Sequence, residues 1–174
     1  MTSYKEIVTK AVIGKGKKYF KNKYSVETES TPSTILGCWI INHKFSGYER
    51  NENVIVDGSF DINIWYSTDN DTKTNVINKT IKYSDEIAVK DKLKVDFTDT
   101  EIVVRALQQP TCSNATINGN EISFDIEKEL GIEVVGDTKV KIAVEDNDDD
   151  WITFNDEKTV EEQIDEDIKE DFLE

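Results

Sequence analysis

The sequence predicts an all-β protein, either an antiparallel β-sandwich or a partly closed barrel, with about eight strands and charged extensions at both ends. Two observations indicate strands: apolar residues alternate with polar ones in several segments, and turn motifs separate these segments. A third sets the limits of the domain, because most apolar residues fall between a basic beginning and an acidic end. We therefore divide the chain into a basic N-terminal segment (1–24), a β domain (25–144) and an acidic C-terminal tail (145–174).

The N-terminal segment contains seven lysines and one glutamate, which is a net charge of +6. Ser3 and Glu6 have the spacing of a helix capping box, and Ile7 and Ala11 follow at helical spacing. The same residues also alternate as those of a strand do. Helix and strand therefore both remain open for residues 3–13.

The longest regular pattern lies at residues 54–66, where apolar and polar positions alternate over thirteen residues. This period of two predicts a long, half-buried strand, and Gly58 at its middle predicts a bulge or bend. Shorter alternations predict further strands at residues 77–83, 102–107, 122–126 and 140–144. Asn118 and Gly119 between apolar residues predict a hairpin, residues 135–138 (VGDT) predict a second one, and residues 68–72 predict a polar loop.

The C-terminal tail contains fifteen acids and two lysines, which is a net charge of −13. Thr159 and Glu162 are spaced as a capping box, and four apolar residues recur at intervals of four: Val160, Ile164, Ile168 and Phe172. This pattern predicts a short acidic helix with a narrow apolar face, while the composition fits a disordered tail equally well. The opposite charges of the two ends favour self-association, although both ends staying solvated is an equal alternative.

Charge and composition exclude several classes of protein. The net charge is −15, whereas nucleic-acid recognition needs a cationic surface. The longest apolar run, residues 35–41, is too short to span a membrane, and the first residues lack the apolar core of a secretory signal. Two cysteines are too few for a disulfide framework, so we expect Cys38 and Cys112 to be free thiols, with Cys112 exposed in a turn and open to cross-linking between chains.

Candidate catalytic and metal-binding groups are sparse. His43 is the single histidine and has no second histidine or cysteine at ligand spacing, so we expect neither a zinc site nor catalysis there. The glycines and lysines of residues 14–18 lack the spacing of a phosphate loop, and the acids near residues 69–71 and 146–150 lack the pattern of a helix-loop-helix calcium site. We therefore predict no catalytic residue, no metal and no cofactor. A hydrolase that uses two of the 36 acids stays open.

The aromatic residues point instead to binding. Trp65 lies on the polar side of the long strand with Asp61 and Asn63, and an exposed tryptophan is a candidate hot spot for a protein partner. Trp39 and Tyr66 accompany it. The same aromatic rings would suit stacking on sugars, so a carbohydrate-binding β-sandwich module is the alternative function.

Six segments of the chain are similar to a known family. Residues 35–44 (ILGCWIINHK), 61–67 (DINIWYS) and 107–112 (LQQPTC) are long and unusual strings. Residues 4–12, 70–74 and 133–140 fit the same pattern in the same order. Together they resemble CotE, the outer spore-coat morphogenetic protein family of endospore-forming bacteria.

The resemblance implies a non-enzymatic scaffold made in the mother-cell cytoplasm and then assembled into the spore coat around the forespore. It implies a homo-oligomer that docks on a SpoIVA-type basement-layer protein and recruits outer-coat client proteins. By this analogy multimerisation would use Lys15, Lys17, Lys18, Trp39, Ile41, His43 and Lys44. Docking would use Asp61, Asn63, Trp65, Tyr66, Asp69 and Asp71. Client recruitment would use tail residues Trp151, Phe154, Val160, Ile164, Ile168 and Phe172.

Overall fold

The computed structural model describes residues 3–90 and 98–144. Six strands follow one another in these ranges: β1 (Ser3–Glu27), β2 (Thr34–Arg50), β3 (Asn53–Thr68), β4 (Lys73–Ala88), β5 (Glu101–Asn118) and β6 (Glu121–Val144). The predicted all-β class is confirmed, and residues 3–13 are strand. This part of the chain forms six strands, fewer than the predicted eight or so. The observed strands are longer than the alternating segments from which strands were predicted. No helix in the described ranges is long and apolar enough to cross a membrane.

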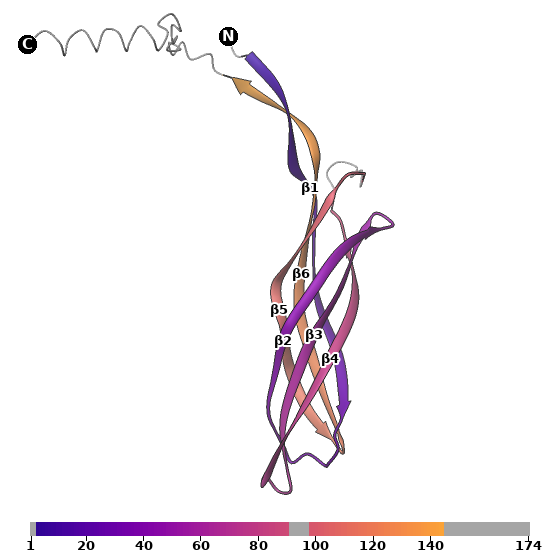
Figure 1. The fold of residues 1–174 in the computed structure, drawn as a ribbon, viewed down its shortest axis with the longest axis vertical. Helices are drawn as coiled ribbons and strands as arrows, with labels where there is room; N and C mark the ends of the chain where they lie inside the picture. Colours follow the sequence, from indigo (N-terminus) through magenta and orange to yellow (C-terminus); the bar gives the residue numbers. More distant parts are fainter. Residues whose placement is uncertain (1–2, 91–97, 145–174) are drawn as a thin grey trace, which may run out of the picture. The chain divides into compact units, whose positions relative to one another are not determined.

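The chain separates into two compact units, one of which comprises residues 6–140. Of the other unit, the structure describes residues 3–5 and 141–144, which are extended strand at the outer ends of β1 and β6. Within the 6–140 unit the strands form two three-stranded sheets, ordered β1-β6-β5 and β2-β3-β4 (Figure 1). The sheets pack together as a β-sandwich, with β6 and β3 as the central strands.

The core lies between these two central strands in two apolar clusters. One cluster contains Phe60, Ile62 and Ile64 of β3 together with Phe124 and Ile126 of β6. The other contains residues from the opposite halves of β3 and β6 and one residue of β4: Val54, Val56, Leu130, Ile132 and Val134, with Ile87 from β4. The predicted alternation over residues 54–66 is thus confirmed, because its even-numbered large side chains all face the core. Burial of these side chains is the main force that holds the two sheets together.

The turn at Gly119 is confirmed as a hairpin that joins β5 to β6, and Gly119 has a φ of +61° there. The second predicted hairpin, at residues 135–138, is wrong, because this segment lies inside β6. Gly136 is there for packing: a Cβ atom at this position would lie 2.8 Å from the Ile13 Cδ1 atom of β1. Close approach of a side chain from a neighbouring strand, as well as a turn, can require a glycine.

Of the bulge or bend predicted at Gly58, the bulge is wrong. Gly58 pairs in register with Phe45 and with Tyr83, and the bulges of this sheet lie in β2, near Leu36 and at Asn42–His43. A Cβ atom at Gly58 would lie 2.3 Å from Tyr83 Cζ. The glycine therefore makes room for the Tyr83 ring between the sheets.

A polar layer separates the two apolar clusters at this level. The Lys128 Nζ atom lies 2.9 Å from Asp85 Oδ2 and 4.0 Å from the centre of the Tyr83 ring. The side chain of Lys128 is only 1% exposed. A buried charge of this kind is tolerable when it has an ionic partner and aromatic faces around it.

Candidate interaction surfaces

The exposed side of the β2-β3-β4 sheet carries a group of large apolar side chains. Trp39, Ile41, Trp65 and Val76 are 54%, 47%, 41% and 41% exposed. Strand pairing places them in three adjacent cross-strand rows, since residues directly opposite each other share a face of the sheet. We call these nine positions the aromatic face: Gly37, Trp65 and Val76; Trp39, Asn63 and Asn78; Ile41, Asp61 and Thr80.

Gly37 determines how the two tryptophans lie. A Cβ atom at Gly37 would approach to 2.4 Å from Trp39 Cη2, so the indole ring of Trp39 covers the backbone of Gly37. Trp65 is the cross-strand partner of Gly37, which makes the two tryptophans diagonal neighbours. The absence of a side chain at residue 37 therefore lets one indole ring lie against the sheet beside the other.

Asp61 is the one charged residue of the aromatic face, and it is held in place by neighbours. Thr80 Oγ1 donates a hydrogen bond to Asp61 Oδ1 (2.6 Å), and Asn42 Nδ2 donates one to Asp61 Oδ2 (2.8 Å). These two hydrogen bonds lower the pKa of Asp61, so it is a carboxylate at neutral pH. Tyr66, expected beside these residues, is 2% exposed and belongs to the core; its period-two position puts it on the inner side of β3.

The acids of the β3–β4 turn interact with side chains at the ends of the two strands that the turn joins. Asp69 forms a 2.8 Å ion pair with Lys73, and Asp71 accepts a hydrogen bond from Ser67. Hydrogen bonding to Ser67 lowers the pKa of Asp71. Both acids have a positive φ, so their backbone conformation is that of a tight turn. The loop predicted at residues 68–72 presents these acids in a fixed arrangement.

The lysines expected to serve multimerisation are not gathered with Trp39. On the outer face of the β1-β6-β5 sheet, Lys15 lies 3.3 Å from Glu133 and Lys17 lies 3.6 Å from Glu129. Lys21 continues this row with ion pairs to Asp125 (3.7 Å) and Glu127 (2.8 Å). We call this row the β1–β6 charge ladder. Lys18 points elsewhere, because its Nζ atom donates to the Glu86 carbonyl oxygen of β4 at 3.3 Å.

His43 is a half-buried residue of the polar layer. Its Nδ1 atom lies 2.9 Å from Gln109 Oε1, which can only accept, so Nδ1 carries a proton and donates. The Nε2 atom is then the acceptor for Tyr83 Oη, at 2.6 Å. Desolvation lowers the pKa of His43, and the positive charge of Lys128 lowers it further. His43 is thus a neutral, structural histidine, whereas its neighbour Lys44 is exposed opposite Ser59.

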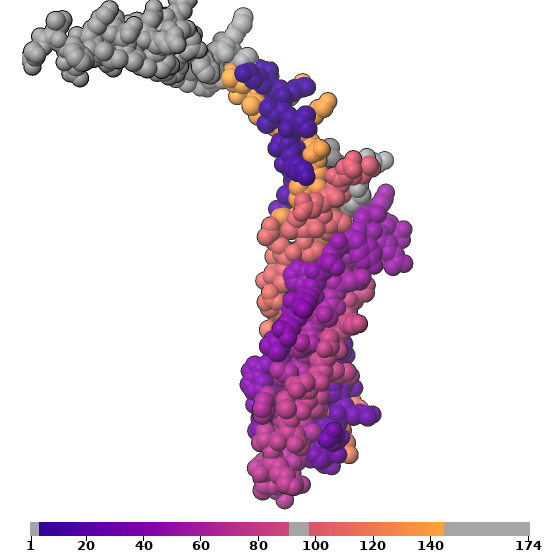
Figure 2. Space-filling model, viewed as in Figure 1, coloured from indigo at the N-terminus to yellow at the C-terminus, as the bar shows by residue number. Residues whose placement is uncertain are grey.

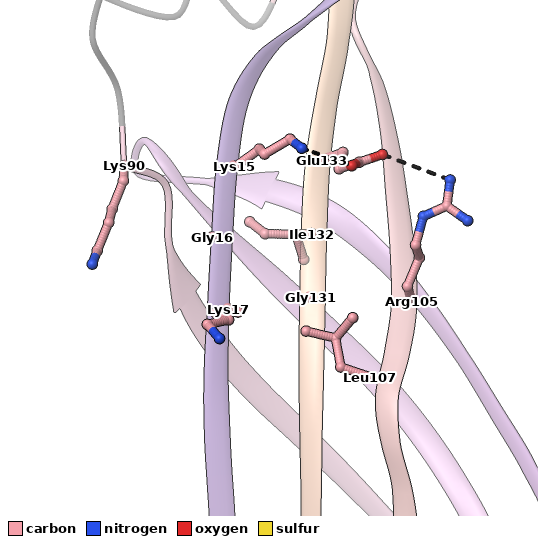
Figure 3. Close-up of a pocket in the computed structure, with 9 residues that line it drawn as sticks. All are labelled: Lys15, Gly16, Lys17, Lys90, Arg105, Leu107, Gly131, Ile132 and Glu133. Atoms are coloured by element: carbon pink, nitrogen blue, oxygen red, sulfur yellow. Dashed lines mark ion pairs between the residues drawn. The ribbon is translucent and has the colours of Figure 1, made fainter.

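A hollow of about 370 Å³ opens on the outer face of the β1-β6-β5 sheet (Figure 3). Gly131 forms its floor, and Leu107 lies over this glycine, 3.0 Å from where a Cβ atom would be. Four cations contribute to the lining: Lys15, Lys17, Lys90 and Arg105. Glu133 is the one carboxylate among the lining residues, between Lys15 and Arg105. The hollow therefore lacks the facing pair of acids that sugar hydrolysis uses.

The match that decides the family covers nearly the whole chain. A family model described as outer spore coat protein E (CotE) matches residues 3–174. The chain belongs to the CotE family. Membership makes it a structural protein of the outer spore coat, as the resemblance of residues 35–44, 61–67 and 107–112 implied. Comparison with curated proteins and with solved structures finds no match.

In this CotE-family chain, the six residues expected to recruit clients lie outside the described residues: Trp151, Phe154, Val160, Ile164, Ile168 and Phe172. Among the described ranges, no group of three or more histidines, cysteines, aspartates or glutamates is arranged to hold a metal ion. The hollow at Gly131 was missed by sequence reasoning. Its one signal is Gly131 itself, which interrupts a series of outward-facing acids along β6.

Proposed function

We propose that this protein is a non-enzymatic morphogenetic scaffold of the spore coat. It assembles with itself, docks on a SpoIVA-type basement-layer protein around the forespore, and recruits outer-coat proteins. It is made in the mother-cell cytoplasm before it enters the coat. The observation that carries the proposal is the aromatic face, because two exposed tryptophans side by side on a rigid sheet are typical of a protein-binding hot spot.

The aromatic face binds a second copy of the chain. Two copies of a protein with a net charge of −15 repel each other at long range. Among the nine positions of this face only Asp61 is charged, and its carboxylate is already hydrogen-bonded to Thr80 and Asn42. It is therefore the surface on which two copies meet with little electrostatic cost and with substantial apolar burial.

The other surfaces remain free for other partners in this arrangement. The β3–β4 turn with Asp69 and Asp71 lies beyond the aromatic face and serves docking on the basement layer. The acidic tail, residues 145–174, serves recruitment of client proteins. We thus keep the division into an N-terminal segment (1–24), a β domain (25–144) and a tail, with contact between copies assigned to the β domain.

The test is the solution mass of the full chain, measured by size exclusion with light scattering over a range of concentrations and salt. We expect concentration-dependent multimers that persist or strengthen at high salt, because salt screens repulsion between copies and spares apolar contacts. The double variant Trp39→Ala, Trp65→Ala should weaken association by about tenfold or more. The matched control is Tyr48→Ala, which removes an exposed aromatic residue at the other end of the same sheet face.

Two results would contradict this assignment. A strict monomer at every concentration would exclude self-assembly of the isolated chain. Multimers that dissociate with salt and ignore the tryptophan substitutions would move the contacts to the charged segments.

A carbohydrate-binding module is the second candidate, favoured by the Trp39 indole lying against Gly37 with Asn63 opposite. A flat ring bordered by amide groups suits a sugar ring. Saturable binding of the monomer to cortex or coat polysaccharide, abolished by Trp39→Ala, would support this function over self-assembly.

A further inference from the structure

The two cysteines of the chain face the same part of the core from different sheets. Cys38 lies on β2, opposite Ile64, and packs against the cluster that contains Phe60 and Phe124. Cys112 lies on β5, opposite Ile126, and packs against the same cluster. Both are free thiols and both are half-buried. The expectation that Cys112 is exposed in a turn is therefore wrong, because residues 101–118 form one continuous strand.

Strands β2 and β5 are edge strands of their sheets and lie along each other at one side of the sandwich (Figure 2). At one end, a Cβ atom at Gly47 would lie 2.6 Å from Val104 Cγ2. In the middle, His43 contacts Gln109 at 2.9 Å. The chain directions are opposite, so the inward-facing residues of β2 beyond His43, which are Ile40 and then Cys38, follow β5 toward Cys112.

The two sulfur atoms already interact. The proximity of the other thiol is the chief cause of a shift in each titration: it raises the pKa of Cys38 and lowers the pKa of Cys112. The thiolate is the nucleophile in sulfur oxidation, so Cys112 is the thiol that reacts first. Cys38 is then in place as the second thiol.

We propose that Cys38 and Cys112 form an intramolecular disulfide bond, which joins the two sheets of the sandwich, when the protein meets a peroxide. The Cys112 thiolate attacks hydrogen peroxide, an S–O bond forms, the O–O bond breaks, and hydroxide leaves and takes up a proton as water. The Cys38 sulfur then attacks the sulfenic acid of Cys112, the S–S bond forms, and a second water leaves. Two thiols are oxidised and one peroxide is reduced to two waters.

The bond would fasten the side of the sandwich where β2 and β5 meet without a shared backbone ladder. It would close a loop of about 75 residues, which removes much conformational freedom from the unfolded chain. We expect the melting temperature to rise by about 10 °C on oxidation, and to return after reduction.

The test uses the reduced full-length chain and hydrogen peroxide, with peptide mapping by mass spectrometry under non-reducing conditions. We expect loss of both free thiols, a mass lower by two hydrogens, one linked peptide pair that contains Cys38 and Cys112, and no covalent dimer. This readout needs no variant, so it does not depend on whether a substituted protein folds. Covalent dimers, two thiols that persist, or Cys112 oxidised to a sulfinic acid with Cys38 intact would each overturn the proposal.

Two single variants separate the steps. Cys38→Ser should leave a sulfenic acid at Cys112 that a dimedone probe traps. Cys112→Ser should leave Cys38 largely unreactive at the same peroxide concentration. Equal dimedone labelling of both variants would contradict the assigned order.

Discussion

The Lys128 Nζ atom on β6 and the Asp85 Oδ2 atom on β4 are 2.9 Å apart inside the sandwich, and they join the central strand of one sheet to an edge strand of the other. The same Asp85 oxygen has no other hydrogen-bond partner among the described residues. Each charge therefore depends on the other to offset the cost of leaving water.

Replacing one member of this pair should be far more harmful than replacing both. Lys128→Met leaves the Asp85 carboxylate buried without a partner, so we expect a loss of about 3–5 kcal/mol in the free energy of unfolding. The double variant Lys128→Met, Asp85→Leu should recover most of that loss, because two apolar residues need no partner. Denaturant titration of the four proteins in a double-mutant cycle measures the coupling.

A surface pair provides the control for that cycle. Lys73 and Asp69 are 2.8 Å apart, but their side chains are 71% and 59% exposed, so Lys73→Ala should cost far less stability than Lys128→Met. A similar small cost for Lys128→Met would mean that water reaches the polar layer.

Stability should depend on the protonation of His43. Its pKa in the folded protein is lowered, mainly by burial and also by the charge of Lys128, against the opposite effect of the hydrogen bond with Gln109, whereas an unfolded histidine titrates at about 6.5. The unfolded chain then binds more protons than the folded one, so stability is complete above about pH 6.5 and falls as the pH drops below that value. Tyr83, Gln109 and the charge of Lys128 act on the ring, from β4, β5 and β6.

His43→Gln should remove this part of the pH dependence while it keeps a polar side chain beside Gln109. Denaturant titrations of both proteins between pH 7.5 and pH 5 test this. Parallel curves for the wild type and the variant would show that His43 does not titrate in that range.

Gly58 and Gly37 allow the same substitution to be compared inside and outside the core. A Cβ atom at Gly58 would meet the Tyr83 ring at 2.3 Å, and Tyr83 is confined by His43, Phe60 and Lys128. We expect Gly58→Ala to cost about 1–3 kcal/mol of stability. Gly37→Ala meets Trp39, which can swing into solvent, so it should cost little stability and instead weaken self-association. Equal stability losses would contradict the outward position of Trp39.

Trp65→Ala should separate association from folding. The side chain is 41% exposed, so we expect a stability loss of about 1 kcal/mol or less and a clear loss of multimers in light scattering. Global unfolding, seen by circular dichroism, would instead place Trp65 among the residues that hold the sandwich together.

Deletion of residues 151–174 should leave the β domain folded and able to multimerise, but deficient in binding outer-coat proteins. Circular dichroism, light scattering and a pull-down with coat extracts report on the three properties separately. Loss of multimers in the shortened chain would contradict the assignment of self-assembly to the aromatic face.

The fold was predictable where the pattern is local. The alternation at residues 54–66 and the Asn118–Gly119 turn each need only neighbours in sequence, and both are confirmed. The functions of Gly136 and Gly58 were misjudged because the side chains that require them, Ile13 and Tyr83, come from other strands. Glycine in a strand pattern signals a constraint without saying whether a turn, a bulge or a neighbour imposes it.

The candidate surfaces divide in the same way. The outward position of Trp65 followed from the period of its own strand, whereas its neighbour Trp39 depended on the register between β2 and β3, including the bulge near Leu36. The proximity of Cys38 to Cys112 depends on how two sheets stack, which no spacing of residues along the chain expresses.

The β1–β6 charge ladder changes what the uneven charge of the sequence means. Three lysines of the basic N-terminal segment, Lys15, Lys17 and Lys21, form ion pairs with acids of β6 on the same sheet face. A protein that approaches this face meets positive charges on β1 beside negative charges on β6, at the distance that separates neighbouring strands. Such a surface favours partners whose charges are arranged in the complementary order. It contributes specificity to binding and little affinity.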